Sequence, residues 1–152
     1  MNAASLSPIL LIEDEPNDVF LIQRACQKAD IHNPLQVVTD GDQAFDYLKG
    51  EGCYADREKY PMPGLVLLDL SLPTFPGFAV LSWMRSQPEL ASVAVIVLSG
   101  SEDREDIDRA YRLGANSYLI KTADLNRLRH MVIDINYFIL TQFSPESVIH
   151  FC

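Results

Sequence analysis

The sequence predicts a doubly wound α/β domain, in which helices cover both faces of a single parallel sheet. Two observations carry this prediction. Short apolar runs alternate with helical patterns along the chain, and the runs at residues 9–13, 64–70 and 93–99 are apolar almost throughout. Strict alternation is typical of parallel strands joined by right-handed crossovers, and a nearly continuous apolar run is typical of a strand covered on both faces.

Five strands and five helices are expected to follow one another in turn. The strands are expected at residues 9–13, 35–39, 64–70, 93–99 and 116–121. The helices are expected at residues 16–26, 40–50, 78–84, 101–114 and 124–140. Pro16 favours the first position of a helix, and Asp40 is a typical N-cap. Gly50 and Gly114 are typical C-terminal stops, so the sequence also predicts where two of the helices end.

The composition limits the class of protein. With 152 residues, of which 48% are hydrophobic, we expect one domain with a core over about 9–140, a C-terminal extension over 141–152 and no output domain. A net charge of −9 without a Lys/Arg cluster disfavours direct binding to nucleic acid. The chain shows neither a signal peptide nor an apolar run of membrane-spanning length, so we expect a cytoplasmic protein that makes no membrane contact.

The candidate functional residues stand at the carboxyl ends of the expected strands. The first strand ends on Glu13 and Asp14, the third on Asp69, the fourth on Ser99 and the fifth on Lys121. Functional groups of a doubly wound sheet gather outside these strand ends. Three carboxylates, one hydroxyl and one amine are therefore expected at one edge of the sheet.

This set of side chains has the chemistry of a site that receives phosphate. Carboxylates packed together repel one another unless a cation compensates, and a few oxygen ligands with room for water suit Mg²⁺. A carboxylate beside Mg²⁺ can attack a phosphoryl group and form an acyl phosphate, while Lys121 and Ser99 bind phosphoryl oxygens. Each residue alone has an ordinary explanation as a helix cap or a solvated side chain, but the set in this order favours the functional one.

The pattern IEDE…LLDLSLP…LSGS…YLIK resembles the receiver domain of two-component response regulators over about residues 9–140. The resemblance implies a flavodoxin-like fold with a five-stranded sheet in the order 2-1-3-4-5. It also implies that Asp69 is the phosphoacceptor, that Asp14 binds Mg²⁺ directly and that Glu13 contributes mainly through water.

Further roles follow from the same resemblance. Asp69 and the backbone carbonyl of Ser71 are the other implied metal ligands. Ser99 is the implied switch hydroxyl, Lys121 the implied phosphate contact and Tyr118 the implied aromatic switch residue. On spacing alone, Tyr118 is equally well explained as a half-buried aromatic residue of a strand.

Two softer features are similar to the small stand-alone regulators that partner bacterial and cyanobacterial phytochromes. They are the polar loop at residues 50–63 and the end of the chain at 134–146. The implied phosphodonor is a histidine kinase and, within this subgroup, a phytochrome. The sequence departs from the usual receiver pattern at Thr122, where proline is usual, and at Gly100, where alanine is common.

The output is expected to be a change in protein contacts. The apolar C-terminal stretch over 137–151 predicts a symmetric homodimer through the last helix and the tail, with packing onto the chain's own core as the alternative. Kinase docking is expected around residues 17–24 and 72–78. Phe20 and Phe75 are either exposed apolar anchors of that surface or ordinary core and loop residues.

Two other functions are alternatives to the phosphoacceptor. An aspartate-nucleophile phosphohydrolase is disfavoured, because Ser71 stands where such an enzyme needs a second Asp and the nucleophile would lie on the third strand. The protein is thus expected to catalyse only its own phosphotransfer and dephosphorylation. A receiver-like dimeric scaffold that signals without phosphate is the remaining alternative.

Overall fold

A five-stranded parallel sheet forms the centre of the molecule in a computed structural model. The structure describes residues 7–121 together with residues 124, 127, 130, 131, 133–135 and 137. The strands are β1 (Ile9–Ile12), β2 (Leu35–Val38), β3 (Leu65–Asp69), β4 (Ala94–Ser99) and β5 (Ser117–Ile120). All neighbouring strands pair in parallel, in the order β2-β1-β3-β4-β5. The predicted fold class and strand order are therefore confirmed.

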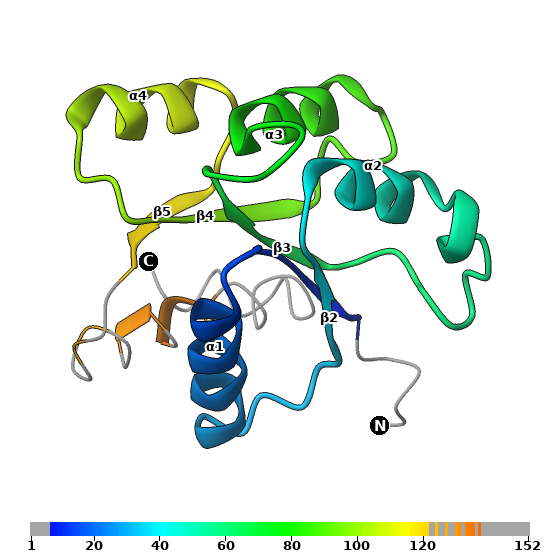
Figure 1. Ribbon diagram of the computed structural model, residues 1–152, viewed down its shortest axis with the longest axis horizontal. Coiled ribbons are helices and arrows are strands. Elements are labelled where there is room, and N and C mark those ends of the chain that lie inside the picture. Colours follow the sequence, from blue (N-terminus) through cyan, green and yellow to red (C-terminus); the bar gives the residue numbers. More distant parts are fainter. Residues whose placement is uncertain are drawn as a thin grey trace, which may run out of the picture.

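Helices cover both faces of this sheet. They are α1 (Pro16–Lys28), α2 (Gly41–Lys49), α3 (Gly77–Ser86) and α4 (Arg104–Arg112), with a short 3₁₀ helix, η2 (Gly52–Tyr54). Figure 1 shows α1 on one face of the sheet and α2, α3 and α4 on the other. The described residues of the expected fifth helix between 127 and 137 are helical, and two of them pack in the same cluster as α1. Across the described residues, no helix combines the length and the apolar character that crossing a membrane would require.

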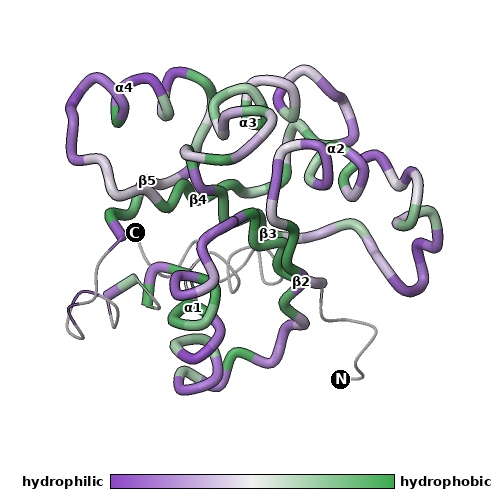
Figure 2. Tube along the Cα trace, viewed as in Figure 1, coloured by the Kyte–Doolittle hydropathy of each residue, from purple (hydrophilic) through white to green (hydrophobic). Residues whose placement is uncertain are grey.

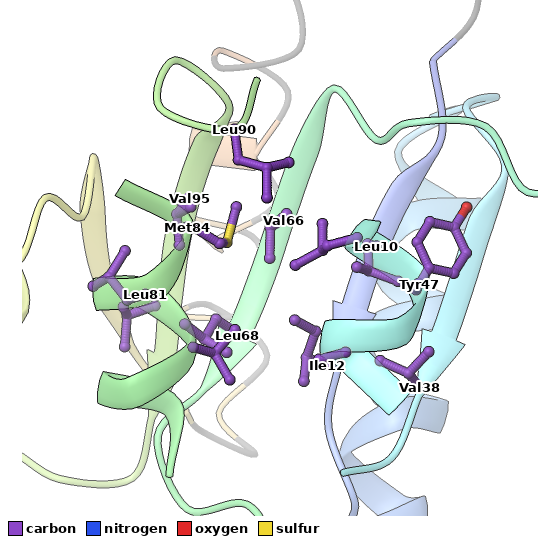
Figure 3. Close-up of a cluster of buried hydrophobic side chains, with 14 of the residues drawn as sticks. Leu10, Ile12, Val38, Tyr47, Val66, Leu68, Leu81, Met84, Leu90 and Val95 are labelled. Carbon is purple, nitrogen blue, oxygen red and sulfur yellow. The ribbon is translucent and has the colours of Figure 1, made fainter. Parts of the chain in front are cut away.

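Alternate residues of each central strand point into two separate cores. In β1, Leu10 and Ile12 belong to the core under α2 and α3, which Figure 3 shows in close-up. Ile9 and Leu11 belong to the opposite core, where they pack with α1. All four side chains are buried, which explains why the strand reads as a continuous apolar run. Figure 2 shows the hydrophobic colour along much of the central strands, whereas hydrophobic and hydrophilic colours alternate along the helices.

The helix ends follow the predicted signals with one exception. Pro16 occupies the start of α1, and the Asp40 carboxylate accepts a hydrogen bond from the Gln43 amide at 2.7 Å. Gly50 ends α2 with a left-handed φ of 71°. The fourth helix begins at Arg104 and not at residue 101, because residues 101–103 form a loop after β4.

The loop between α2 and β3 is held by an arginine and three tyrosines. Arg57 donates hydrogen bonds to the carbonyls of Tyr47 (2.8 Å), Leu48 (2.9 Å) and Tyr60 (3.0 Å). Two of these carbonyls belong to the last turn of α2, so Arg57 supplies donors that the helix end lacks. The rings of Tyr47, Tyr54 and Tyr60 lie 5.0–6.0 Å apart between centroids. The expected polar loop is thus a compact element with its own aromatic cluster.

Candidate functional site

Three carboxylates meet at the carboxyl edge of the sheet. Ile12, the last residue of β1, is paired in parallel with Leu68 of β3, so the acids that follow β1 lie beside the acid that ends β3. The carboxylate oxygens of Glu13, Asp14 and Asp69 all lie within 4.8 Å of one another. Glu13 and Asp69 are buried, at 1% and 3% exposure, whereas Asp14 is exposed. The convergence that the strand ends predicted is present, and its exposed side is formed by Asp14.

Lys121 brings a positive charge into this cluster from the end of β5. Its Nζ lies 2.6 Å from Glu13 Oε1 and 3.3 Å from Asp69 Oδ1. Burial lowers the pKa of Lys121, but the hydrogen bond with Glu13 and the charge of Asp69 outweigh it and raise the pKa above its ordinary value. The ammonium therefore remains charged and bridges two of the three acids.

A third partner of Lys121 was not singled out from the sequence. The Nζ atom donates a hydrogen bond to Oδ2 of Asp18 at 3.1 Å. Asp18 lies in the first turn of α1, four residues after Asp14. The available signal was the place of Asp18 in the first turn of the helix that follows Glu13 and Asp14, where an acid is explained by the helix dipole. It did not indicate that this acid would face a lysine more than a hundred residues away.

Glu13 is the most perturbed acid of the site. Its Oε1 atom is buried and makes no hydrogen bond beyond the ion pair with Lys121 among the residues that the structure describes. Burial raises the pKa of Glu13 to about 7, and the charge of Asp69 adds to this, whereas hydrogen bonds from Lys121 and from the Glu15 amide lower it. Burial thus disfavours the ionised form of Glu13, and a further positive charge beside it would stabilise that form.

This donor set fits a divalent cation. A buried carboxylate oxygen without a full set of partners, a second buried carboxylate and an exposed one offer oxygen ligands with an opening to water, as hard cations require. Glu13, Asp14 and Asp69 are the residues that could hold such an ion. Ser71, whose backbone carbonyl is an implied ligand, contacts the site through its amide, which donates a hydrogen bond to Asp69 Oδ1 at 3.2 Å.

The stability of the metal-free protein is expected to fall as the pH rises from about 4.5 to about 7. In this window the folded protein keeps the Glu13 proton while the unfolded chain releases it, so the free energy of unfolding decreases by up to about 1.4 kcal/mol per pH unit. Above about pH 7 both states are ionised and the contribution is constant.

Urea unfolding in the presence of a chelator, at several pH values across this window, measures the effect. Glu13→Gln is the matched variant, because glutamine has nearly the same shape and does not titrate. The difference in unfolding free energy between wild type and Glu13→Gln should change across the window and level off above it. A difference that stays constant with pH would contradict the raised pKa of Glu13.

The segment after Asp69 packs tightly against the site. The Gly77 amide donates to the Leu70 carbonyl at 3.0 Å, which joins the start of α3 to the end of β3. A Cβ atom at Gly77 would clash with the backbone oxygen of Asp69 and lie 2.7 Å from Leu70 Cα. The absence of a side chain at Gly77 therefore allows α3 to approach the backbone that carries Asp69.

Ser99 and Tyr118, the two expected switch residues, meet at the backbone of Ser101. The Ser99 hydroxyl accepts a hydrogen bond from the Ser101 amide at 3.1 Å, and the Tyr118 hydroxyl donates to the Ser101 carbonyl at 2.8 Å. The Ser101 hydroxyl donates to Asp106 of α4 at 2.6 Å. The loop after β4 thus connects the hydroxyl at the sheet edge to Tyr118 and to α4.

Several expectations lie partly or wholly outside the described residues. Thr122 is one of them, and the C-terminal stretch expected to form a dimer is described only at residue 137. The two phenylalanines left open by the sequence are both exposed, Phe20 at 57% and Phe75 at 42%. Core packing is therefore excluded for Phe20. Phe75 is a loop residue whose ring lies 5.3 Å from that of Phe45, so both explanations for it stay open.

Comparisons with known proteins agree with this geometry. A family model described as the response regulator receiver domain matches residues 9–133. Response regulator Rcp1 of Synechocystis sp. strain PCC 6803 is 37% identical over 130 residues, which cover 86% of each chain. A probable methanogenesis regulatory protein, FilR2 of Methanothrix harundinacea, is 36% identical over 84% of this chain and 79% of its own.

Solved structures of response regulators are also similar to this chain. The phosphorylated cyanobacterial phytochrome response regulator RcpA superposes with a TM-score of 0.80 at 38% identity, over 90% of this chain and 95% of its own. The Mn²⁺-bound form of Rcp1 superposes with a TM-score of 0.77 at 36% identity, over 87% of this chain and 93% of its own. One relative thus carries a divalent cation and another a phosphoryl group.

Proposed function

Because this chain belongs to the response regulator receiver domain family, we propose that it accepts a phosphoryl group from a histidine kinase on Asp69 and signals through changed protein contacts. The observation that carries the proposal is the cluster at the sheet edge. Two buried carboxylates and an exposed one lie within 4.8 Å of one another, and a lysine ammonium contacts the two buried ones. A structural salt bridge would need only one acid for one lysine.

Asp69 is the proposed nucleophile. An oxygen of its carboxylate would form a bond to phosphorus while the bond between phosphorus and the kinase histidine nitrogen breaks, which leaves an acyl phosphate on Asp69 and returns the histidine to the kinase. The amide of Ser71 holds the carboxylate in place through Oδ1. Lys121 would donate from its ammonium to an oxygen of the incoming phosphoryl group, since it already lies 3.3 Å from Asp69.

The proposed metal is Mg²⁺, held by Asp14 and Asp69 directly, by the Ser71 carbonyl and by Glu13 mainly through water. Bound there, Mg²⁺ would supply positive charge to the phosphoryl oxygens and to the clustered acids. Support comes from the oxygen-only donor set, from the buried Glu13 oxygen and from the Mn²⁺-bound relative.

Signalling is proposed to pass from Ser99 to Tyr118. A phosphoryl group on Asp69 offers new acceptors to the Ser99 hydroxyl, which ends the neighbouring strand. If Ser99 moves, the loop at Ser101 moves with it, because the Ser101 amide and carbonyl bond Ser99 and Tyr118. The surface formed by α4 and β5 would change as a result. The added charge on Asp69 is local, but its structural effect would extend to this surface.

The partners are proposed by analogy with the relatives. Several similar structures are those of phytochrome or bacteriophytochrome response regulators, so a phytochrome-type histidine kinase in the cytoplasm is the proposed phosphodonor. Exposed Phe20, with Arg24 stacked 6.0 Å from its ring, and exposed Phe75 are proposed contacts of the kinase. A homodimer through the last helix and tail and no direct nucleic-acid contact complete the proposal.

The first test is the intact mass of the protein after incubation with Mg²⁺ and acetyl phosphate. The expected result is a gain of one phosphoryl group, which is lost when a chelator replaces Mg²⁺, because the clustered acids would then repel the incoming anion. A mass gain that survives the chelator would contradict the metal role. No gain from acetyl phosphate or from a cognate kinase would favour the phosphate-independent dimeric scaffold.

A further inference from the structure

Among the residues that the structure describes, Asp18 is the acid in contact with Lys121 that the proposed phosphotransfer does not use. It lies on α1, while the other two acids that contact the ammonium follow β1 and end β3. Its Oδ2 accepts a hydrogen bond from Lys121 Nζ at 3.1 Å, in a contact that is partly buried. The ammonium is thus held from the side of α1 as well as from the sheet.

Among the described residues, the ammonium has three carboxylate partners. Lysine carries three donors on a flexible stem, and the contacts of Lys121 are Glu13 at 2.6 Å, Asp18 at 3.1 Å and Asp69 at 3.3 Å. Glu13, the closest and most buried of the three acids, attracts the ammonium away from Asp69. Asp18 gives the ammonium a further acceptor on α1, and this limits its freedom to turn toward Glu13 alone.

We propose that Asp18 is a positioning residue that keeps the Lys121 ammonium aimed at the place where the phosphoryl group arrives. This inference rests on the proposed phosphorylation of Asp69. When a phosphoryl oxygen replaces Asp69 Oδ1 as a partner, one N–H turns to it, while the ion pair with Glu13 and the hydrogen bond to Asp18 remain. Without Asp18, the flexible stem lets the ammonium collapse onto Glu13, and the positive charge available to the phosphoryl group decreases.

Helix stabilisation alone does not explain the geometry of Asp18. An acid in the first turn favours a helix by its charge, and a capping acid accepts a backbone N–H. In α1, the capping hydrogen bond is made by Glu15, which accepts from the Asn17 amide. The Asp18 carboxylate instead contacts Lys121, with its side chain 30% exposed.

The test compares initial phosphorylation rates with Mg²⁺ and acetyl phosphate. Asp18→Ala is expected to be about fivefold slower than wild type, the effect of losing one partly exposed charged hydrogen bond. Asp18→Asn keeps an oxygen acceptor and is expected to recover most of the rate. Asp42→Ala is the matched control, because Asp42 is an exposed acid in the first turn of α2 that has no role in the site.

A double-mutant cycle separates positioning from a merely structural role. If Asp18 acts through the ammonium, Asp18→Ala has no effect on the rate in a Lys121→Ala background. The inference is overturned if Asp18→Ala matches wild type, or if it slows phosphorylation equally in both backgrounds. In those cases the wild type still gains its phosphoryl group and the proposed function stands. A wild type that gains none overturns the proposed function and this inference with it.

Discussion

Replacement of Asp69 by asparagine is expected to abolish phosphoryl gain completely. The amide keeps the size of the carboxylate but is not a nucleophile. The two neighbouring acids, Glu13 and Asp14, are not expected to take its place as the phosphoacceptor. Glu13 is engaged by Lys121 at 2.6 Å and is protonated over part of the neutral range, since burial raises its pKa to about 7. Asp14 is exposed, outside the contacts of the ammonium.

Intact mass after incubation with Mg²⁺ and acetyl phosphate gives a direct reading. Asp42→Asn is the matched control, since it removes an exposed acid elsewhere and should gain one phosphoryl group as wild type does. Full phosphorylation of Asp69→Asn would place the acceptor on another residue.

Titration of Glu13 in Asp69→Asn gives a second test that does not depend on phosphate. Removing the charge of Asp69 removes one cause of the raised pKa of Glu13, so that pKa should fall.

Much of this site could be predicted because a parallel sheet brings its strand ends to one edge. Once β1 and β3 are expected from their apolar runs, the positions of Glu13, Asp14 and Asp69 follow, and Lys121 follows β5 by the same rule. The register of the strands determines which residues lie at this edge, and the hydrophobic pattern indicates that register. Side-chain detail is not needed.

What could not be predicted depends on the rotation of helices and the course of loops. Asp18 contacts Lys121 because the rotation of α1 about its axis turns this side chain toward the residue that follows β5. No local sequence pattern predicts that rotation. The link between Tyr118 and the Ser101 carbonyl depends on the path of the loop after β4. The late start of α4 has the same origin, because the sequence there favours helix while the loop needs residues 101–103.

Gly77→Ala is expected to destabilise the protein by about 3 kcal/mol, the upper part of the usual range for overpacking. The added methyl group would meet the backbone oxygen of Asp69 and the Cα of Leu70. Backbone atoms cannot turn aside as a flexible side chain can, so either α3 or the end of β3 must shift. A shift of the end of β3 moves Asp69 itself, so slower phosphorylation should accompany the loss of stability in that case.

Gly100→Ala is the matched control, at a glycine that directly follows the end of β4. A Cβ atom at Gly100 has open space around it, and its backbone does not need glycine. Its stability should therefore change by less than about 1 kcal/mol, with a small gain possible because alanine restricts the unfolded chain. Urea unfolding of both variants measures the contrast. Equal stability of Gly77→Ala and Gly100→Ala would mean that α3 can move away from β3 at little cost, and Asp69 would then be less firmly placed than its contacts indicate.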